Sequence, residues 1–344
     1  MEIILVTGGA GFIGSHTCVQ LLDRGCNVCI IDSLVNSSEK IISQIKLIND
    51  TTGLKKGKLF FRKGDLRDKF FIHNVFLEFK NMNLPFDSVI HFAGLKAVEE
   101  SINYPLDYWD SNINSTINLL NVMNEFNCNN LVFSSSATIY DPNKKNKYKE
   151  KSQKKPINPY GNTKLTIEII LKDLYLSSKN KWKIVNLRYF NPVGAHSSGI
   201  IGENPKCMPT NLFPIILKVA NGERNKISIF GNDWPTKDGT CIRDYIHVMD
   251  LADAHLAAIE YLEYNEPQII SLNIGTGKGT SVLELINKFV EVNKVKIPYT
   301  YKQRRKGDAA NVVADNSLAL RLLNWFPKRE INDICIDGFR SINK

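Results

Sequence analysis

The sequence has no long hydrophobic run. Of its 344 residues, no stretch approaches the roughly 20 consecutive apolar residues that a membrane-spanning helix requires. The opening residues 1–7, MEIILVT, are too short and too β-like for a signal peptide. We therefore expect a cytoplasmic protein with no membrane partner.

Cysteine is also sparse. The seven cysteines, at positions 18, 26, 29, 128, 207, 241 and 335, are odd in number and scattered, which does not suit a disulfide framework. Cys26 and Cys29 form a C-x-x-C, but their surroundings, CNVCIID, are typical of a buried strand, and no second pair completes a zinc site. We expect reduced thiols packed in the core, and no metal.

Positive charge is in excess, with a formal net charge of +9. Much of it lies in residues 141–155, DPNKKNKYKEKSQKK, which contain few apolar residues and are predicted to form a solvated loop. Since lysine and asparagine are frequent throughout, the excess does not indicate a nucleic-acid partner. A substrate that carries phosphates would also favour positive charge.

The first half alternates short β-rich runs with longer helical patterns, which is typical of the α/β class and of a doubly wound parallel Rossmann-type sheet. Strands are predicted at 2–7, 27–32, 58–62, 87–92, 130–135 and 183–189, and helices near 12–24, 38–50, 68–80, 112–126 and 158–179. After residue 190 the pattern loosens, with helical runs at 247–262 and 281–293. We expect a first domain of residues 1–190 and a smaller mixed α/β domain of residues 191–344, with part of 247–263 packing back on the first.

A glycine-rich turn, VTGGAGFIGSH, follows the first strand and opens the first helix. Gly9, Gly11 and Gly14 match G-x-G-x-x-G, while Gly8, Gly11 and Gly14 match G-x-x-G-x-x-G. Either pattern allows a tight turn that brings backbone N–H groups close to a pyrophosphate. A lone motif of this kind is weak evidence, but here the strand, the helix and a downstream carboxylate accompany it.

That carboxylate is Asp32, which ends the second predicted strand. At this position it can accept both ribose hydroxyls of an adenosine, and it would repel a 2′-phosphate, so NAD is favoured over NADP. The plainer alternative is an aspartate that merely ends a strand in a turn. Asp65, in KGDLR after the third strand, is similarly placed to reach the adenine edge.

Tyr160 and Lys164, in NPYGNTK, lie one helical turn apart on the same face of a predicted helix. A free tyrosine, with a pKa of about 10, is a poor base at neutral pH. A neighbouring ammonium group together with an oxidised nicotinamide would lower that pKa, and Ser136 would hydrogen-bond the same substrate hydroxyl. The set predicts proton abstraction coupled to hydride transfer.

These motifs resemble the extended short-chain dehydrogenase/reductase family, and most closely its nucleotide-sugar 4-epimerases, over nearly the whole chain. The resemblance extends to HFAGLKAVEES, FSSSATIY, LRYFNPVGAH, IFGNDWPTKDGTCIRDYIHVMDLADAH and RRKGD. It implies interconversion of UDP-galactose and UDP-glucose with NAD kept bound, through C4 hydride abstraction, rotation of a 4-keto sugar and hydride return. It also implies a homodimer formed through helices matching 100–126 and 158–179.

The resemblance carries site residues onto this chain. It implies catalytic roles for Ser136, Tyr160 and Lys164. Cofactor contacts are expected from Gly8, Gly11, Phe12, Ile13, Gly14, Asp32, Asn36, Asp65, Leu66, Phe92, Ala93, Gly94, Lys96, Asn112, Ser134, Tyr160, Lys164 and Tyr189. UDP-sugar contacts are expected from Lys96, Ser136, Tyr160, Asn191, Asn211, Leu212, Phe230, Arg243, Arg305, Asp308 and Val312.

Several features leave alternatives open. Val312 borders the sugar pocket by similarity, and its small size suggests activity on UDP-N-acetylhexosamines as well.

Tyr140 is followed by Asp141, where the family normally has glycine, so the loop beside the site is expected to be longer and more mobile. Rival functions are a nucleotide-sugar 4,6-dehydratase or decarboxylase, which would need an extra acid and base near residues 135–139, and a non-catalytic NAD-binding protein.

Overall fold

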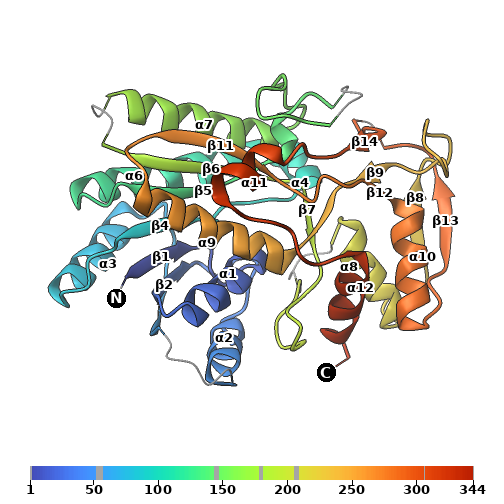
Figure 1. The fold of residues 1–344 in the computed structure, drawn as a ribbon, viewed down its shortest axis with the longest axis horizontal. Coiled ribbons are helices and arrows are strands. Elements are labelled where there is room, and N and C mark those ends of the chain that lie inside the picture. Colours follow the sequence, from blue (N-terminus) through green and yellow to red (C-terminus); the bar gives the residue numbers. More distant parts are fainter. Residues whose placement is uncertain are drawn as a thin grey trace.

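The computed structural model describes residues 2–51, 57–142, 147–177, 181–204, 209–305 and 307–343. Its centre is a seven-stranded, all-parallel sheet in the order β11-β6-β5-β4-β1-β2-β3, with helices on both faces (Figure 1). The strands are β1 Ile3–Thr7, β2 Asn27–Asp32, β3 Leu59–Lys63, β4 Ser88–His91, β5 Asn130–Ser136, β6 Lys183–Tyr189 and β11 Ile269–Ile274. The predicted doubly wound α/β fold is confirmed.

Alternation along the strands divides the core between the two faces of the sheet. Ile4 and Val6 of β1 pack toward one layer of helices, whereas Ile3 and Leu5 pack toward the other. The first layer contains α1 Phe12–Asp23, α2 Lys40–Thr51, α9 Val248–Tyr264 and α11 Ser317–Leu323. The second contains α3 Lys69–Asn81, α6 Ser115–Glu125 and α7 Pro159–Ser177.

The six predicted strands and five predicted helices of the first half are confirmed to within a few residues. The seventh strand, β11, was not predicted. It pairs with β6 in the register Ile269↔Ile184, far from it in sequence. Two short helices, α4 Val98–Asn103 and α5 Pro105–Trp109, were also missed and precede a single π-helical turn, η1 Asp110–Asn114.

A second hydrophobic core lies beside the sheet. It is built by α8 Leu212–Ala220, α10 Val282–Asn293 and α12 Ile331–Arg340 with the paired strands β8 Ile227–Phe230 and β13 Tyr299–Lys302. Phe213, Ile286 and Phe289 are fully buried there. Smaller sheets join this unit to the first: β7 Asn191–Val193 with β10 Tyr245–His247, and β9 Ile242–Arg243 between β12 Thr280–Ser281 and β14 Asn311–Val312.

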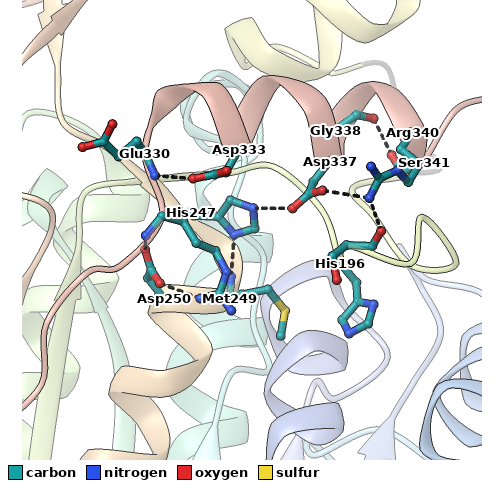
Figure 2. A network of polar contacts seen from close by, with 12 residues as sticks. His196, His247, Met249, Asp250, Glu330, Asp333, Asp337, Gly338, Arg340 and Ser341 are labelled. Atoms are coloured by element: carbon teal, nitrogen blue, oxygen red, sulfur yellow. Dashed lines mark hydrogen bonds and ion pairs between the residues drawn. The ribbon is translucent and has the colours of Figure 1, made fainter. Parts of the chain in front are cut away.

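A polar network ties α12 to the start of α9 (Figure 2). The His247 Nδ1 accepts a hydrogen bond from the Met249 backbone N–H at 3.1 Å and so caps α9. The proton therefore lies on Nε2, which faces the Asp337 carboxylate at 3.4 Å. Arg340, which also pairs with Asp337, donates to the Ser197 carbonyl. These contacts hold the turn near residue 197 against α12.

No helix among the described residues is long and apolar enough to cross a membrane. Six cysteines lie within the described ranges and are unbridged, including Cys26 and Cys29, while Cys207 lies outside them. Burial raises the pKa of the Cys29 thiol to about 12. In the same part of the chain no group of His, Cys, Asp and Glu side chains could hold a metal ion.

Candidate active site

The glycine turn connects β1 to α1 at the carboxyl edge of the sheet. A Cβ on Gly8, whose φ is +70°, would lie 2.7 Å from the Ala93 backbone nitrogen, and one on Gly14 would lie 2.5 Å from the Gly8 carbonyl oxygen. The turn, the loop after β4 and the first turn of α1 thus approach too closely for any side chain. Gly11 is the N-cap and offers no side-chain cap to α1, so no capping side chain occupies the first N–H groups of this helix, as an anion site requires.

Phe12 and Ile13, the first two residues of α1, are half-buried beside this turn. The predicted ribose ligand, Asp32, holds the turn in place. Its Oδ2 accepts from the Ala10 N–H at 3.0 Å, and its Oδ1 accepts from the Leu34 N–H at 2.8 Å. The loop after β2, which includes the exposed Asn36, is thereby fixed against the glycine turn.

The loop after β3 places Asp65 at the surface and buries Leu66. The Asp65 carboxylate pairs with the Arg67 guanidinium at 2.7 Å, and hydrogen bonds from Arg67 lower its pKa. Arg67 also reaches Asp110 at 2.8 Å. The predicted adenine contact is therefore part of a surface ion-pair cluster.

Asn112 lies in the π-helical turn and clamps the loop after β4. Its Oδ1 accepts from the Leu95 N–H at 2.8 Å, while its Nδ2 donates to the Leu95 carbonyl at 3.1 Å and to the Thr163 hydroxyl at 3.0 Å. Because Thr163 lies in α7, one side chain joins the β4 loop to the helix that carries Tyr160. Such π turns recur at functional sites because they redirect side chains from a regular helix.

The β4 loop contains the expected cofactor residues Phe92, Ala93, Gly94 and Lys96. The Phe92 ring lies 4.7 Å from the ring of His255 in α9. Gly94 adopts φ +151° against Asn112, where a Cβ would meet the Asn112 Oδ1 at 2.9 Å. The Lys96 ammonium pairs at 3.1 Å with the buried carboxylate of Glu203, which lies beyond β7.

The three expected catalytic side chains meet at the end of β5. The Tyr160 hydroxyl lies close enough to Ser136 for that side chain to lower its pKa, and the Lys164 Nζ donates to the Ser134 carbonyl at 2.8 Å. The same ammonium lies 5.9 Å from the centre of the Tyr160 ring and 4.9 Å from that of Phe133. The four-residue spacing therefore does place both side chains of α7 on β5.

Burial governs the charges of this pair. It raises the pKa of Tyr160 to about 12, against the lowering effect of the neighbouring Ser136 side chain, and it lowers the pKa of Lys164 to about 7. The sequence predicted that Lys164 and a nicotinamide together lower the Tyr160 pKa. Within the protein chain the desolvation of the phenol is the larger effect, so a further positive charge beside it is required for ionisation at neutral pH.

Tyr189, at the end of β6, stands beside the same residues. Its hydroxyl lies 2.5 Å from the Nε2 of His255, and the nearby Ser134 side chain partly offsets the rise in its pKa that burial causes. The His255 Nδ1 lies 2.8 Å from the Leu251 carbonyl, so it carries the proton and the Tyr189 hydroxyl donates to Nε2. His255 thus contacts both Tyr189 and Phe92 and holds them in place. Sequence reasoning did not assign this role to it.

A buried ion pair behind the catalytic residues was also missed. Glu168 lies one turn beyond Lys164 in α7 and binds the Arg188 guanidinium through two contacts of 2.9 and 2.6 Å. Ser135 donates to the same carboxylate at 2.6 Å. The i, i+4 spacing from Lys164 is a visible signal, but the partner, Arg188, is set only by tertiary packing.

The expected substrate residues fall into three groups. On paired strands β9 and β14, Arg243 faces Val312 in register and lies 3.5 Å from Asp308, and it donates to the Ala309 carbonyl at 2.8 Å. At the end of β8, the Arg305 guanidinium lies 3.9 Å above the Phe230 ring. Asn211 and Leu212 begin α8, where Asn211 is exposed.

Asn191 connects the first group to the catalytic strands. It opens β7 two residues after Tyr189, and its N–H donates to the Asp244 carbonyl at 3.0 Å, adjacent to Arg243. The structure therefore joins Tyr160, Ser136, Asn191, Arg243 and Val312 through neighbouring strands.

Known proteins match the whole chain. A family model described as GDP-mannose 4,6 dehydratase matches residues 5–337. A UDP-glucose 4-epimerase of Cyamopsis tetragonoloba is 49% identical, the match covering 100% of this chain and 95% of the relative.

Solved structures agree. A UDP-glucose 4-epimerase from Stenotrophomonas maltophila, crystallised with NAD and formylated UDP-arabinopyranose, superposes with a TM-score of 0.93 at 43% identity, covering 99% of this chain and 98% of that one. The enzyme from Bifidobacterium longum, in complex with NAD+ and UDP, gives 0.91 at 42% identity over 99% and 98% of the two chains. Identity at this level over the full length, together with the assembled Ser136, Tyr160 and Lys164, shows that the chain belongs to the UDP-glucose 4-epimerase family of extended short-chain dehydrogenases/reductases.

Proposed function

We propose that this protein interconverts UDP-galactose and UDP-glucose with a retained NAD. The observation that carries the proposal is the meeting of Ser136, Tyr160 and Lys164 at the carboxyl end of β5, on the sheet edge that also bears the glycine turn. In doubly wound folds ligands bind at this edge. The relatives named above, which bind NAD and UDP or a UDP-sugar, support the same substrate class.

In this reaction the Tyr160 oxygen takes the proton of the sugar C4 hydroxyl and later returns it. Ser136, which lies beside Tyr160, orients that hydroxyl, and Lys164 is held by the Ser134 carbonyl so that its charge lies beside the phenol. NAD, when bound, accepts and returns the C4 hydride, and its oxidised ring supplies the positive charge that favours the phenolate. Between the two transfers the 4-keto sugar rotates, so that its opposite face is presented for hydride return.

Rotation of the sugar requires that the nucleotide be bound tightly while the hexose is bound loosely. Arg243 and Arg305 are assigned to the diphosphate because planar guanidinium groups pair well with phosphate oxygens. Phe230 lines the uracil site and Asp308 accepts a ribose hydroxyl. Contacts to the sugar and its phosphates come from Lys96, Asn191, Asn211, Leu212 and Val312.

For the cofactor, Gly8, Gly11 and Gly14 with Phe12 and Ile13 bind the pyrophosphate, and Asp32 and Asn36 bind the adenosine ribose. Asp65 and Leu66 border the adenine. The remaining contacts come from Phe92, Ala93, Gly94, Lys96, Asn112, Ser134 and Tyr189, which surround the site between the β4 loop and β6.

A 4,6-dehydratase on the same scaffold is disfavoured. Elimination of water needs an added acid and base, and those enzymes carry a carboxylate directly after the threonine or serine that follows β5. Here Thr138 is followed by Ile139, which is fully buried. The carboxylate of Glu168, also nearby, is already bound to Arg188 and Ser135.

Activity on UDP-N-acetylhexosamines is a second part of the proposal. Val312 is half-buried in β14 beside Arg243. Because its side chain is short, we expect it to tolerate a C2 substituent on the sugar. A change of methylene size in a pocket alters discrimination by about 1–3 kcal/mol. UDP-N-acetylgalactosamine that fails to react while UDP-galactose is converted would remove this part.

We also propose a cytoplasmic homodimer. Large apolar side chains gather on α4 to α7 and are exposed: Ile102, Leu106, Trp109, Ile117 and Ile169. A second copy of the chain would cover them.

The decisive experiment is a product assay with purified protein, UDP-galactose and no added NAD. Conversion to UDP-glucose is expected, since the cofactor would purify with the protein. Formation of a 4-keto-6-deoxy product would instead favour the dehydratase, and absence of turnover even with NAD added would refute the proposed activity.

A further inference from the structure

The basic segment, residues 141–155, contacts both sides of the candidate site. Residues 143–146 lie outside the described part of the chain. The segment leaves β5 through a 3₁₀ turn, η2 Ala137–Ile139, and it returns to α7. Its ends pair with each other and with that turn, the Asp141 N–H donating to the Gln153 carbonyl at 3.1 Å and the Lys155 N–H to the Ile139 carbonyl at 2.9 Å. The predicted solvated loop is thus anchored at its base.

One residue of this segment, Tyr148, is only 2% exposed although lysines flank it on both sides. Its N–H donates to the Val313 carbonyl at 2.9 Å, and its carbonyl accepts from the Asp315 N–H at 2.8 Å. These bonds make a parallel bridge opposite Ala314. Tyr148 is therefore paired, through its backbone, with the segment 311–315 that carries Val312.

The Tyr148 ring is fixed from the other direction. It packs against Tyr140 at 5.2 Å and Phe190 at 6.4 Å between ring centres, and its hydroxyl donates to the Asp141 carbonyl at 3.0 Å. Both neighbours adjoin the catalytic strands, since Tyr140 follows η2 and Phe190 follows Tyr189. The Asn273 amide of β11 also donates to the Tyr148 carbonyl at 2.7 Å.

On its far side, segment 311–315 is held by the strand of Arg243. The buried Asp244 accepts from the Ala314 N–H at 3.1 Å, and the Asp244 N–H donates to the Val312 carbonyl at 3.0 Å. Val312 packs against the same cluster that contains Tyr148 and Phe190. Segment 311–315 thus runs between β9 and Tyr148, and its position depends on both.

We propose that Tyr148 is a specificity-determining positioning residue, which sets how closely the Val312 segment approaches the Ser136 and Tyr160 side of the site. It touches neither reacting atoms nor, by this assignment, the cofactor. The inference rests on the proposed epimerase function, because it names the residue that shapes the sugar pocket of that same site. Loss of the ring would let segment 311–315 move, which would weaken UDP-sugar binding and alter the tolerance for a C2 substituent.

The test compares Tyr148→Ala with the wild-type holoenzyme on UDP-galactose and UDP-N-acetylgalactosamine. For Tyr148→Ala we expect KM for UDP-galactose to rise about tenfold, and the ratio of kcat/KM between the two sugars to change at least about threefold. The value of kcat should change less than about threefold, because Ser136, Tyr160 and Lys164 keep their contacts. UDP affinity, measured by titration without turnover, should fall in parallel.

Two further variants complete the experiment. Tyr148→Phe keeps the ring and its packing and is expected to retain wild-type KM and sugar ratio. Tyr148→Leu keeps apolar volume without the ring, and it decides the question if the alanine variant does not fold.

Wild-type KM, UDP affinity and sugar ratio in the alanine or leucine variant would overturn the inference. So would a loss confined to kcat and equal for both sugars. A wild-type protein that binds UDP but turns over neither sugar would instead refute the proposed function, and the UDP titrations of the variants would still decide whether Tyr148 positions the segment.

Discussion

Tyr160 combines a half-buried ring, a raised pKa and a position beside Ser136 and Lys164, which makes its hydroxyl the single group whose removal should stop the chemistry. We expect Tyr160→Phe to reduce kcat by about 10²–10⁴-fold, because proton transfer loses its acceptor. The ring remains, so the melting temperature and the bound NAD measured by absorbance should be unchanged. Tyr264→Phe, at a site 86% exposed on α9, is the control and should behave as wild type. Full turnover in the Tyr160 variant would show that another group is the base.

Glu2 provides a test of pH dependence away from the site. Burial, with the nearby charges of Glu263 and Asp87, raises its pKa from 4.5 to about 7. A carboxyl whose folded pKa is raised contributes stability below its unfolded pKa, and this contribution is lost as pH rises through the folded pKa. Thermal melts should therefore show Glu2→Gln more stable than wild type at pH 8, with the difference disappearing near pH 4.

The exposed Glu223 has a lowered pKa, so its contribution to stability should change with pH in the opposite direction to that of Glu2. Its pKa is lowered by hydrogen bonds from Lys218 and Asn221. Glu223→Gln should be slightly less stable than wild type at pH 8, and the loss should fade as pH falls. The same trend in both variants would contradict the assigned environment of Glu2.

At the residue scale, sequence reasoning could place residues side by side where their arrangement depends on local spacing. Tyr160 and Lys164 are four residues apart in one helix, and the glycines form a single turn. It could not pair Glu168 with Arg188, or Tyr189 with His255, because each pair joins elements that meet only in the folded sheet. The raised pKa of Tyr160 was also unforeseen, since burial is a property of the whole packing arrangement.

The turn between β1 and α1 allows the requirements of fold and cofactor to be separated. Gly14 has no room for a Cβ, which would lie 2.5 Å from the Gly8 carbonyl oxygen, whereas a Cβ on Gly11 would lie 3.2 Å from it. Gly14→Ala should lower the melting temperature strongly, because backbone must shift. Gly11→Ala should fold nearly normally yet bind NAD more weakly, because its methyl group meets the approaching pyrophosphate. Calorimetry and NAD titration of the two variants distinguish these effects, and equal losses of stability would refute the separation.

Among the elements, those with strong internal periodicity were predictable and those defined by a distant partner were not. The strand β11 is six residues long and follows a helix, so nothing local showed that it would complete the main sheet beside β6. In the basic segment, lysines dominate the composition, so the burial of Tyr148 could not be predicted from the sequence. That burial depends on pairing with the distant segment 311–315.

At the scale of the whole molecule, the exposed apolar surface of α4 to α7 predicts association. Leu106, in α5, is 79% exposed. If a second copy covers it, Leu106→Asp should shift the protein from twice the mass of one chain toward a single chain in sedimentation. Tyr264→Asp changes a residue on α9 that is 86% exposed, and it should not shift the mass. A wild-type protein that sediments as one chain at micromolar concentration would remove the dimer proposal.

The path of the chain through the main sheet has a consequence for its synthesis. Synthesis of β6 is complete at Tyr189, but its outer edge gains a partner only when β11, Ile269–Ile274, has been made. The helix α9, which covers one face of the sheet, is made between these two strands. At translation rates of about 5–20 residues per second, this interval lasts on the order of ten seconds. During that time the nascent chain exposes one unpaired edge of β6 and uncovered apolar surface at the ribosome, where chaperone binding and aggregation compete with completion of the sheet.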